Sequence, residues 1–231
     1  MLTENHKKPL VAFIILCWYN EDLLKECFES IQEQSYKNHI TVMVDNGSAD
    51  GSVAYAKKHF PWVKVVEAGA NLGFSKGNNL GIEETIKAYP DVEHFVLLNS
   101  DARLHKRWTD EVVSFVSNKP TVATVQGTTL DYYNHEIVDS THIYVARNGQ
   151  ATQGGWRNCY DGEFGPKKVF GCNAAALLLT RKFVDAQPFG REVLDETFFI
   201  YLEDVDLAMR ATLMGWDNYI VPYGRDTISA I

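Results

Sequence analysis

Asp45 is the first residue of this 231-residue chain whose type and position favour binding chemistry. It ends the apolar run Ile40–Val44 and opens a turn of small polar residues, DNGSADG. A carboxylate at a strand end can accept hydrogen bonds from a base edge or from ribose hydroxyls. The other polar residues of the turn would serve equally well as caps of the following helix.

A glycine-rich segment, Gly69–Asn79, follows the next apolar run and precedes a helical pattern. It matches neither GxxxxGK[ST] nor GxGxxG, the two standard phosphate-binding patterns. Gly73 and Gly77 would still allow close backbone approach to a ligand, and the N-terminus of the helix would favour an anion. Lys76 adds a positive charge. The segment therefore fits either a phosphate-binding loop or an ordinary capped loop.

The triplet Asn99–Asp101, which follows the apolar run VLL, could bind a hard divalent cation. Mg²⁺ and similar ions take oxygen ligands, often one or two carboxylates together with substrate phosphates. Asp101 offers a carboxylate and Asn99 only a neutral carbonyl oxygen. The same Asn-Ser-Asp string is also a good turn and helix cap.

Three carboxylates, Glu203, Asp204 and Asp206, crowd the expected start of a helix after an aromatic run, TFFIYL. A helix N-terminus favours acidic residues through its dipole, and that could account for one or two of them. A carboxylate beside an apolar wall is also a plausible general base if it reaches a substrate proton.

The elements that must position these groups alternate between short apolar runs and helix-period segments, which predicts an α/β domain with a mostly parallel sheet flanked by helices. In such sheets ligands bind beyond the carboxyl ends of the strands. The expected strands are Leu10–Cys17, Ile40–Val44, Val63–Glu67, Phe95–Leu98 and Val122–Val125, and the expected helices are Glu21–Gln34, Ser52–His59, Gly77–Ala88, Trp108–Ser117 and Glu203–Met214.

The segment Thr128–Lys168 does not continue this alternation of strands and helices, and it is either an antiparallel insertion or a mobile flap. It is rich in Tyr, Asn, Gly and His and has no helix period. Trp156 within it could stack on a bound ligand or pack inside the insertion. A regular pattern resumes at Val169–Arg181, which is apolar. Without a repeat or a flexible linker, we expect one compact domain over residues 1–231.

Composition excludes several classes of function. Thirty acidic against twenty-two basic residues give a net charge of −8, whereas proteins that bind a nucleic-acid backbone carry a basic face. The four cysteines form no CxxC pair, which is typical of reduced thiols in a cytoplasmic protein. The polar start lacks a signal sequence, and the apolar runs are too short to span a membrane. We therefore expect a cytoplasmic enzyme.

Six strings, taken in order, resemble the family 2 glycosyltransferases with the GT-A fold, a Rossmann-like fold of nucleotide-diphospho-sugar transferases. The strings are VAFIILCWYNE, VMVDNGSADGS, NLGFSKGNNLGI, FVLLNSDA, VFGCNAAALLLTRKF and DETFFIYLEDVDLAMRATLMGW, and they cover the chain from Val11 to about Pro222. The NLGFSKGNN, LLNSD and FFIYLEDVDL forms look most like the rhamnosyltransferase-like branch, which often builds cell-envelope polysaccharides.

The resemblance implies an inverting hexosyltransferase with a nucleotide-sugar-binding half, about residues 1–126, and an acceptor-binding half, about 127–231. Asp101 would contact Mg²⁺ or Mn²⁺ and the donor diphosphate, and Asp204, beside Glu203, would be the catalytic base. The donor nucleotide would contact Tyr19, Glu21, Asp45, Asn71, Gly73, Lys76, Asn78, Ser100 and Asp101, and the sugar or acceptor pocket would contain Cys172, Asn173, Trp156 and Glu203.

The resemblance also implies the substrates. The donor would be dTDP- or UDP-linked, with dTDP-L-rhamnose as the best single guess, and the acceptor a polysaccharide or lipid-linked glycan, with at most peripheral association at the inner face of the membrane. Tyr19–Asp22 does not resemble the glycine-rich loop of a nucleotidyltransferase. Asn99 occupies the position of the first Asp in the metal motif of the family. Members of the family also commonly have a His, a possible metal ligand, shortly after the segment that matches Val221-Pro222, whereas no His follows His142 in this sequence. Beside the active transferase, these two departures leave three alternatives: a chain truncated at its C-terminus, an incomplete metal site, or an inactive nucleotide- or glycan-binding module.

Overall fold

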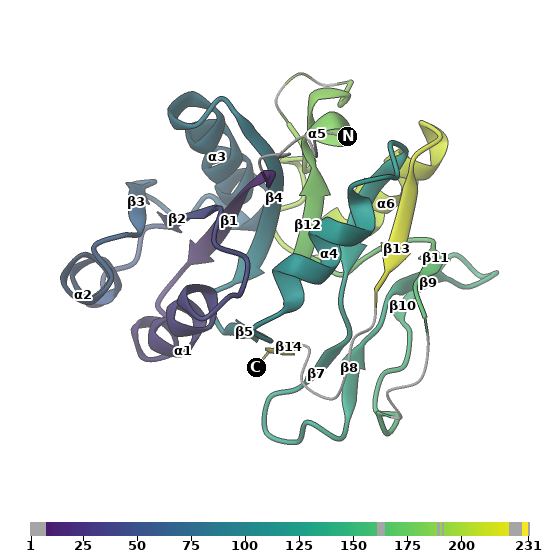
Figure 1. The fold of residues 1–231 in the computed structure, drawn as a ribbon, viewed down its shortest axis with the longest axis horizontal. Helices are drawn as coiled ribbons and strands as arrows, with labels where there is room; N and C mark the ends of the chain where they lie inside the picture. The colour runs from purple at the N-terminus through teal and green to yellow at the C-terminus, as the bar shows by residue number, and fades with distance from the viewer. Residues whose placement is uncertain (1–7, 161–164, 189, 191, 222–227, 231) are drawn as a thin grey trace, which may run out of the picture.

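A computed structural model describes residues 8–160, 165–188, 190, 192–221 and 228–230. Its main feature is an eight-stranded sheet with the order β11-β13-β6-β12-β4-β1-β2-β3 (Figure 1). The strands are β1 (Leu10–Cys17), β2 (His39–Asp45), β3 (Lys64–Glu67), β4 (Val92–Asn99), β6 (Val122–Gln126), β11 (Lys167–Val169), β12 (Ala176–Thr180) and β13 (Asp217–Ile220). The predicted α/β class, with a large sheet flanked by helices, is confirmed.

The four strands of the first half, β3, β2, β1 and β4, run parallel, and their register aligns their carboxyl ends. Cys17 at the end of β1 lies opposite Asp45 at the end of β2, and Leu16 lies opposite Asn99 at the end of β4. The polar residues that follow these strands therefore start from one edge of the sheet. Beyond β4 the sheet is mixed, because β12 runs antiparallel to both β4 and β6.

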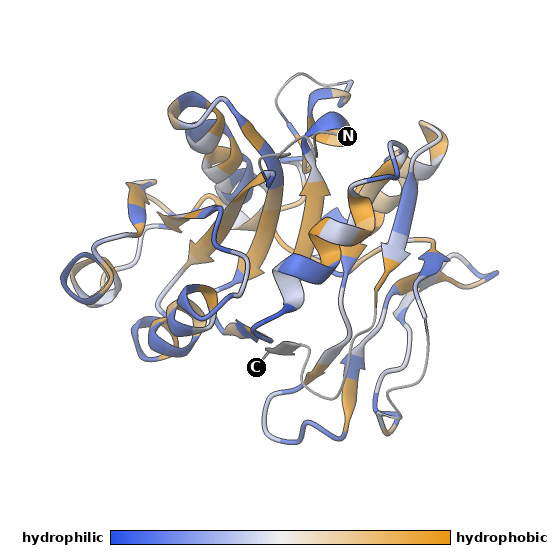
Figure 2. Ribbon diagram, in the orientation of Figure 1, coloured by the Kyte–Doolittle hydropathy of each residue, from blue (hydrophilic) through white to orange (hydrophobic). Residues whose placement is uncertain are grey.

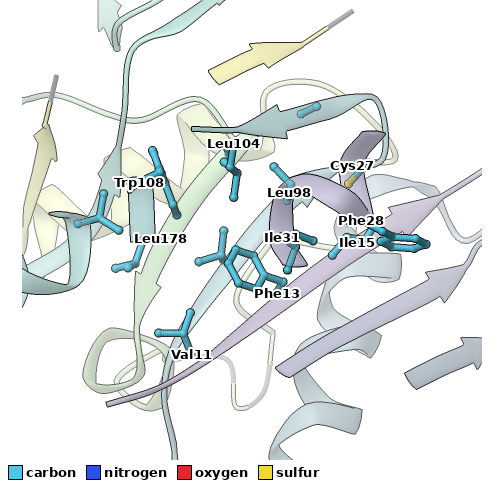
Figure 3. Close-up of a cluster of buried hydrophobic side chains, with 14 of the residues drawn as sticks. Val11, Phe13, Ile15, Cys27, Phe28, Ile31, Leu98, Leu104, Trp108 and Leu178 are labelled. Carbon is cyan, nitrogen blue, oxygen red and sulfur yellow. The ribbon is translucent and has the colours of Figure 1, made fainter. Parts of the chain in front are cut away.

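Helices cover both faces of the sheet, and alternate side chains of β1 separate the two layers. Phe13 and Ile15 belong to a hydrophobic cluster with α1 (Glu21–Gln32), α2 (Ser52–His59) and α4 (Trp108–Val116), shown in Figure 3. Ala12 and Ile14 belong to a second cluster, with α3 (Gly73–Ala88), α5 (Arg181–Asp185) and α6 (Glu203–Leu213). The central strands β1, β4 and β12 are mostly apolar, whereas the helices carry polar outer faces (Figure 2), as expected for a sheet whose centre is buried on both sides.

The insertion is the antiparallel alternative of the two that the sequence left open. Two short hairpins form it, β7 (Thr129–Asp131) with β8 (Val138–Ser140) and β9 (Ile143–Val145) with β10 (Ala151–Gln153). A small sheet of order β5-β14-β7-β8 adds β5 (Ala102–Leu104) and β14 (Ile228–Ala230) to the first hairpin.

The structure differs from the sequence-based expectation at several short elements. The strands β5, β13 and β14 and the helix α5 were not predicted, and each has five residues or fewer, too few to show a hydrophobic period. Helix α3 begins at Gly73 rather than at Gly77. No helix within the described ranges combines the length and apolarity needed to cross a bilayer.

Candidate functional site

Hydrogen bonds join the loops that follow β1, β2 and β4. The Asn20 side-chain amide donates to Ser100 Oγ over 2.7 Å. The backbone N–H of Tyr19 donates to Ser48 Oγ over 3.1 Å, and Tyr19 itself has a positive φ of 57° and a half-exposed ring. These contacts bring the predicted nucleotide-binding residues of three separate strand ends together. Asn20, which was not predicted as a site residue, connects two of the loops.

Two of the predicted polar residues have structural roles in the turn after β2. Asp45 is 5% exposed, and its carboxylate accepts a hydrogen bond from the backbone N–H of Ser48 over 3.1 Å. Asn46 donates to Asn71 Oδ1 over 3.0 Å and accepts from the backbone N–H of Leu72 over 2.8 Å. Neither contact caps the following helix α2, whose N-cap Gly51 makes no side-chain cap hydrogen bond, and the Asn46 contacts instead fix the position of the Asn71 loop.

From Gly73 onward the glycine-rich segment is helical rather than a loop. Because α3 begins at Gly73, Asn78 lies inside the helix, is 2% exposed and donates its side-chain amide to the Phe74 carbonyl oxygen over 3.0 Å. Lys76 Nζ lies 3.6 Å from a carboxylate oxygen of Glu196, so its positive charge is partly compensated. Neither residue belongs to the walls of the main cavity described below.

Gly73 allows the loop before α6 to pack against the start of α3. Its φ is +80°, and an added Cβ would lie 2.5 Å from the Phe199 carbonyl oxygen. That oxygen accepts a hydrogen bond from the backbone N–H of Phe74 over 2.6 Å. The position therefore excludes every residue except glycine, both by its dihedral angle and by space.

We expect Gly73→Ala to destabilise the protein by about 2–4 kcal/mol, since it combines left-handed strain with a collision against backbone. Gly69→Ala is the matched control, because Gly69 has a φ of +77° but nothing within 4 Å of its Cβ position. Its cost should be about 1 kcal/mol. Equal losses for the two variants in urea unfolding would show that packing against Phe199 contributes nothing.

A cavity with a volume of about 630 Å³, here called the main cavity, lies between the end of β4, the insertion and the start of α6. Its polar wall includes four carboxylates, and residues of the aromatic run before α6 contribute apolar side chains. The lining residues are Phe74, Asn99, Asp101, Asp139, Ile143, Ala151, Thr152, Gln153, Asn173, Ala174, Ala175, Ile200, Tyr201, Leu202, Glu203, Asp204 and Val205. The wall of the cavity therefore contains both Asp101, the predicted metal ligand, and Asp204, the predicted base.

Asp101 and Asp204 are both held in surroundings that favour their neutral forms. Burial raises the pKa of Asp101, and its Oδ1 is buried with no hydrogen-bond partner among the described residues. Burial also raises the pKa of Asp204, although the backbone N–H groups of Val205, at 2.8 Å, and Ala174 oppose that shift. Each group would gain from a ligand, Asp101 from a cation and Asp204 from a proton.

Glu203 is 6% exposed, and its Oε2 has no hydrogen-bond partner in the described part of the chain. Burial, together with the neighbouring Asp204, raises its pKa. A carboxyl with a raised pKa in the folded state binds protons more tightly there than in the unfolded chain. The free energy of unfolding therefore falls as the pH rises through the ordinary value of 4.5 towards the raised one.

We expect Glu203→Gln to increase stability at pH 7.5 and to change it less at pH 4, because the amide removes a desolvated charge. Thermal unfolding at the two pH values checks the sign. Glu136→Gln, which changes an exposed side chain in the insertion, provides the control. A Glu203→Gln protein less stable than wild type at pH 7.5 would contradict the assignment of a destabilising carboxylate.

The predicted sugar and acceptor residues separate into three environments. Asn173 lines the cavity and accepts a hydrogen bond from the Ala175 N–H over 2.7 Å. Cys172 lies in the core rather than on the cavity wall, and burial raises the pKa of its thiol to about 12. Trp156 is 60% exposed, which rules out the packed core of the insertion, and it lies outside the cavity wall.

Sequence reasoning missed the polar residues that the insertion contributes, namely Asp139, Thr152 and Gln153. They lie on three-residue strands, which are too short for a period of two to be visible. Pro222, where the resemblance ended, lies outside the described residues. In the part of the chain that is described, no three His, Cys, Asp or Glu side chains are grouped closely enough to hold a metal by themselves.

The arrangement of the sheet and helices is the GT-A fold. Two solved structures support this assignment of the fold: GalNAc-T7 with UDP, GalNAc and Mn²⁺ (TM-score 0.75, 12% identity, 98% of this chain and 44% of that one) and the mannosyltransferase PcManGT from Pyrobaculum calidifontis with GDP-Man and Mn²⁺ (TM-score 0.64, 18% identity, 97% and 57%). Residues 13–171 match the profile of Glycosyl transferase family 2. The chain belongs to that family.

A curated relative supports the branch suggested by the sequence. The chain is 26% identical over 203 residues to an N-acetylglucosaminyl-diphospho-decaprenol L-rhamnosyltransferase of Mycobacterium tuberculosis. The match covers 78% of this chain and 63% of the relative, so this chain spans less than two thirds of that protein. An uncharacterized glycosyltransferase of Haemophilus influenzae is also 26% identical, over 65% of this chain and 44% of its own length.

Proposed function

We propose that this protein is an inverting glycosyltransferase that moves a sugar from a nucleotide-sugar to a hydroxyl of a glycan. The observation that carries the proposal is the convergence of Asp101 and Asp204 on one 630 Å³ cavity at the carboxyl ends of the parallel strands. Membership of Glycosyl transferase family 2 supports the same reaction class.

The proposed donor is dTDP-L-rhamnose, and a UDP-linked sugar is the alternative. The L-rhamnosyltransferase named among the relatives supports the rhamnosyl group. The same name supports a lipid-linked acceptor, an N-acetylglucosaminyl diphospholipid. We propose that the protein acts in the cytoplasm and associates at most peripherally with the inner face of the membrane.

In the proposed mechanism Asp204 accepts the proton of the incoming hydroxyl as that oxygen bonds to the anomeric carbon. An alcohol is too weakly acidic to attack unaided, so a positioned base lowers the barrier. The bond from the anomeric carbon to the nucleoside diphosphate breaks in the same step, which inverts the configuration. Burial raises the pKa of Asp204, which strengthens it as a base.

Asp101 fits the role of a ligand for Mg²⁺ or Mn²⁺. It offers a buried carboxylate oxygen without a hydrogen-bond partner among the described residues, and Asn99 adds a carbonyl oxygen at the same cavity. Such ions are often held by one or two protein carboxylates together with substrate phosphates, so a three-carboxylate cluster is not required. The ion would neutralise charge on the departing diphosphate.

Calorimetric titration with dTDP, UDP and GDP, each with and without Mn²⁺, tests the donor site. We expect one nucleotide to bind, and to bind more tightly with Mn²⁺. The nucleotide that binds is then presented as its sugar conjugate, with a short-chain prenyl diphospho-N-acetylglucosamine as acceptor, and the anomeric configuration of the product is read by NMR. Nucleotide binding without transfer would favour an inactive binding module, and no binding at all would contradict the proposal.

A further inference from the structure

The insertion places one carboxylate, that of Asp139, on the wall of the main cavity. Successive side chains of a strand point to opposite faces, and β8 follows this rule. Val138 lines a second cavity of about 350 Å³ on one side of the strand, while Asp139 lines the main cavity on the other. The register of β8 therefore directs a charged group into the space that also contains Asp204.

The carboxylate of Asp139 is not in an ion pair in the described part of the chain. Burial and the charge of Asp131 raise its pKa, and the charge of Arg157 only partly opposes them. A carboxylate in such a place loses part of its hydration and gains no protein partner in return. It is therefore available to accept hydrogen bonds from a ligand.

Strand β10, in the second hairpin of the insertion, adds polar groups of a kind that recognises sugars. Thr152 and Gln153 of β10 are exposed residues that line the same cavity, and β8 and β10 lie on the same side of the molecule (Figure 1). A carboxylate accepts two hydrogen bonds from adjacent hydroxyls, a hydroxyl donates and accepts, and an amide does both. The three residues thus match the donors and acceptors of a polyhydroxylated ring.

On this basis we propose that Asp139 is the acceptor-specificity residue, which binds adjacent hydroxyls of the acceptor sugar while Gln153 and Thr152 bind its outer edge. This inference rests on the proposed function. The donor nucleotide belongs to the strand ends of the first half, whereas Asp139 belongs to the insertion. A sugar held against the insertion would present a further hydroxyl to Asp204.

The test compares nucleotide and sugar binding in wild type, Asp139→Asn and Glu136→Gln. Glu136 is an exposed carboxylate three residues before Asp139, and Glu136→Gln removes the same charge outside the cavity. Nucleotide binding is measured by calorimetry with dTDP and UDP. Sugar binding is measured by NMR titration with the methyl glycosides of L-rhamnose, N-acetylglucosamine, mannose and galactose, with Mg²⁺, both with and without nucleotide.

We expect at least one glycoside to bind wild type and Glu136→Gln equally, and to bind Asp139→Asn about tenfold or more weakly, since a charge-assisted hydrogen bond is lost. Nucleotide affinity should be the same in all three proteins. Gln153→Ala, on a different strand, should weaken glycoside binding in the same direction but less, and it serves as the second variant if Asp139→Asn does not fold.

Glycoside binding that is unaffected by Asp139→Asn and Gln153→Ala would overturn the inference, as would the absence of any glycoside binding to wild type. Either result leaves nucleotide binding, and with it the proposed function, intact. Failure of wild type to bind any nucleotide would instead contradict the proposed function. The titrations without nucleotide would then still decide whether Asp139 binds sugar.

Discussion

Asp204→Asn should lower the rate of sugar transfer by at least about 10²-fold and leave nucleotide binding unchanged. The amide fits the same space at the start of α6 and can still accept the hydrogen bond from the Val205 N–H, but it cannot accept a proton. Steady-state transfer and calorimetric titration of the donor nucleotide, made on the same preparation, separate the two effects.

The pH dependence of the wild-type enzyme provides a second measurement of this base. Because burial raises the pKa of Asp204, the group is protonated and inactive at low pH. The acidic limb of the kcat/KM profile should therefore lie above the usual range of an aspartate, with activity increasing as the pH rises through it.

Asp206→Asn is the matched control, since Asp206 lies in the same helical turn but outside the cavity, where it pairs with Arg210 at 2.7 Å. It removes the same charge from the helix N-terminus and should change the transfer rate by no more than about threefold. An Asp204→Asn protein that transfers sugar at the wild-type rate would disprove the base assignment.

Asp101→Asn should weaken metal-dependent nucleotide binding by about tenfold or more, because it replaces a charged oxygen ligand by a neutral one. Transfer should fall at least as far. The protein should fold normally, since the change removes a carboxylate whose pKa is raised by burial. Titration of dTDP and UDP at several Mn²⁺ concentrations measures the loss.

Asn99→Asp is the opposite change at the same end of β4, and it restores the first carboxylate of an Asp-x-Asp pair. Asn99 lines the same cavity as Asp101, so the new carboxylate should increase Mn²⁺ affinity. If Asp101→Asn binds nucleotide and Mn²⁺ as wild type does, the metal assignment is wrong whatever the effect of Asn99→Asp.

Local sequence patterns predicted most of the first half of the fold. Leu10–Cys17 is a continuous apolar run and forms β1 with the expected bounds, and Ser52–His59 forms α2 as expected. The sequence pattern predicted the wrong start for α3, because it assigned Gly73 to a loop and began the helix at Gly77. A glycine with positive φ can begin a helix when another segment, here the loop containing Phe199, packs on it, and that contact is invisible in the sequence.

The sequence by itself determined that polar strand-end groups would meet at one edge of a sheet, because parallel strands in register must end together. Tertiary structure alone decided which of them face the cavity. Asp45 and Asn78 are engaged in local hydrogen bonds, Cys172 is buried in the core, and Asp139 enters the cavity from the insertion. Side-chain direction on short strands depends on register with distant partners, and local residue patterns do not encode that register.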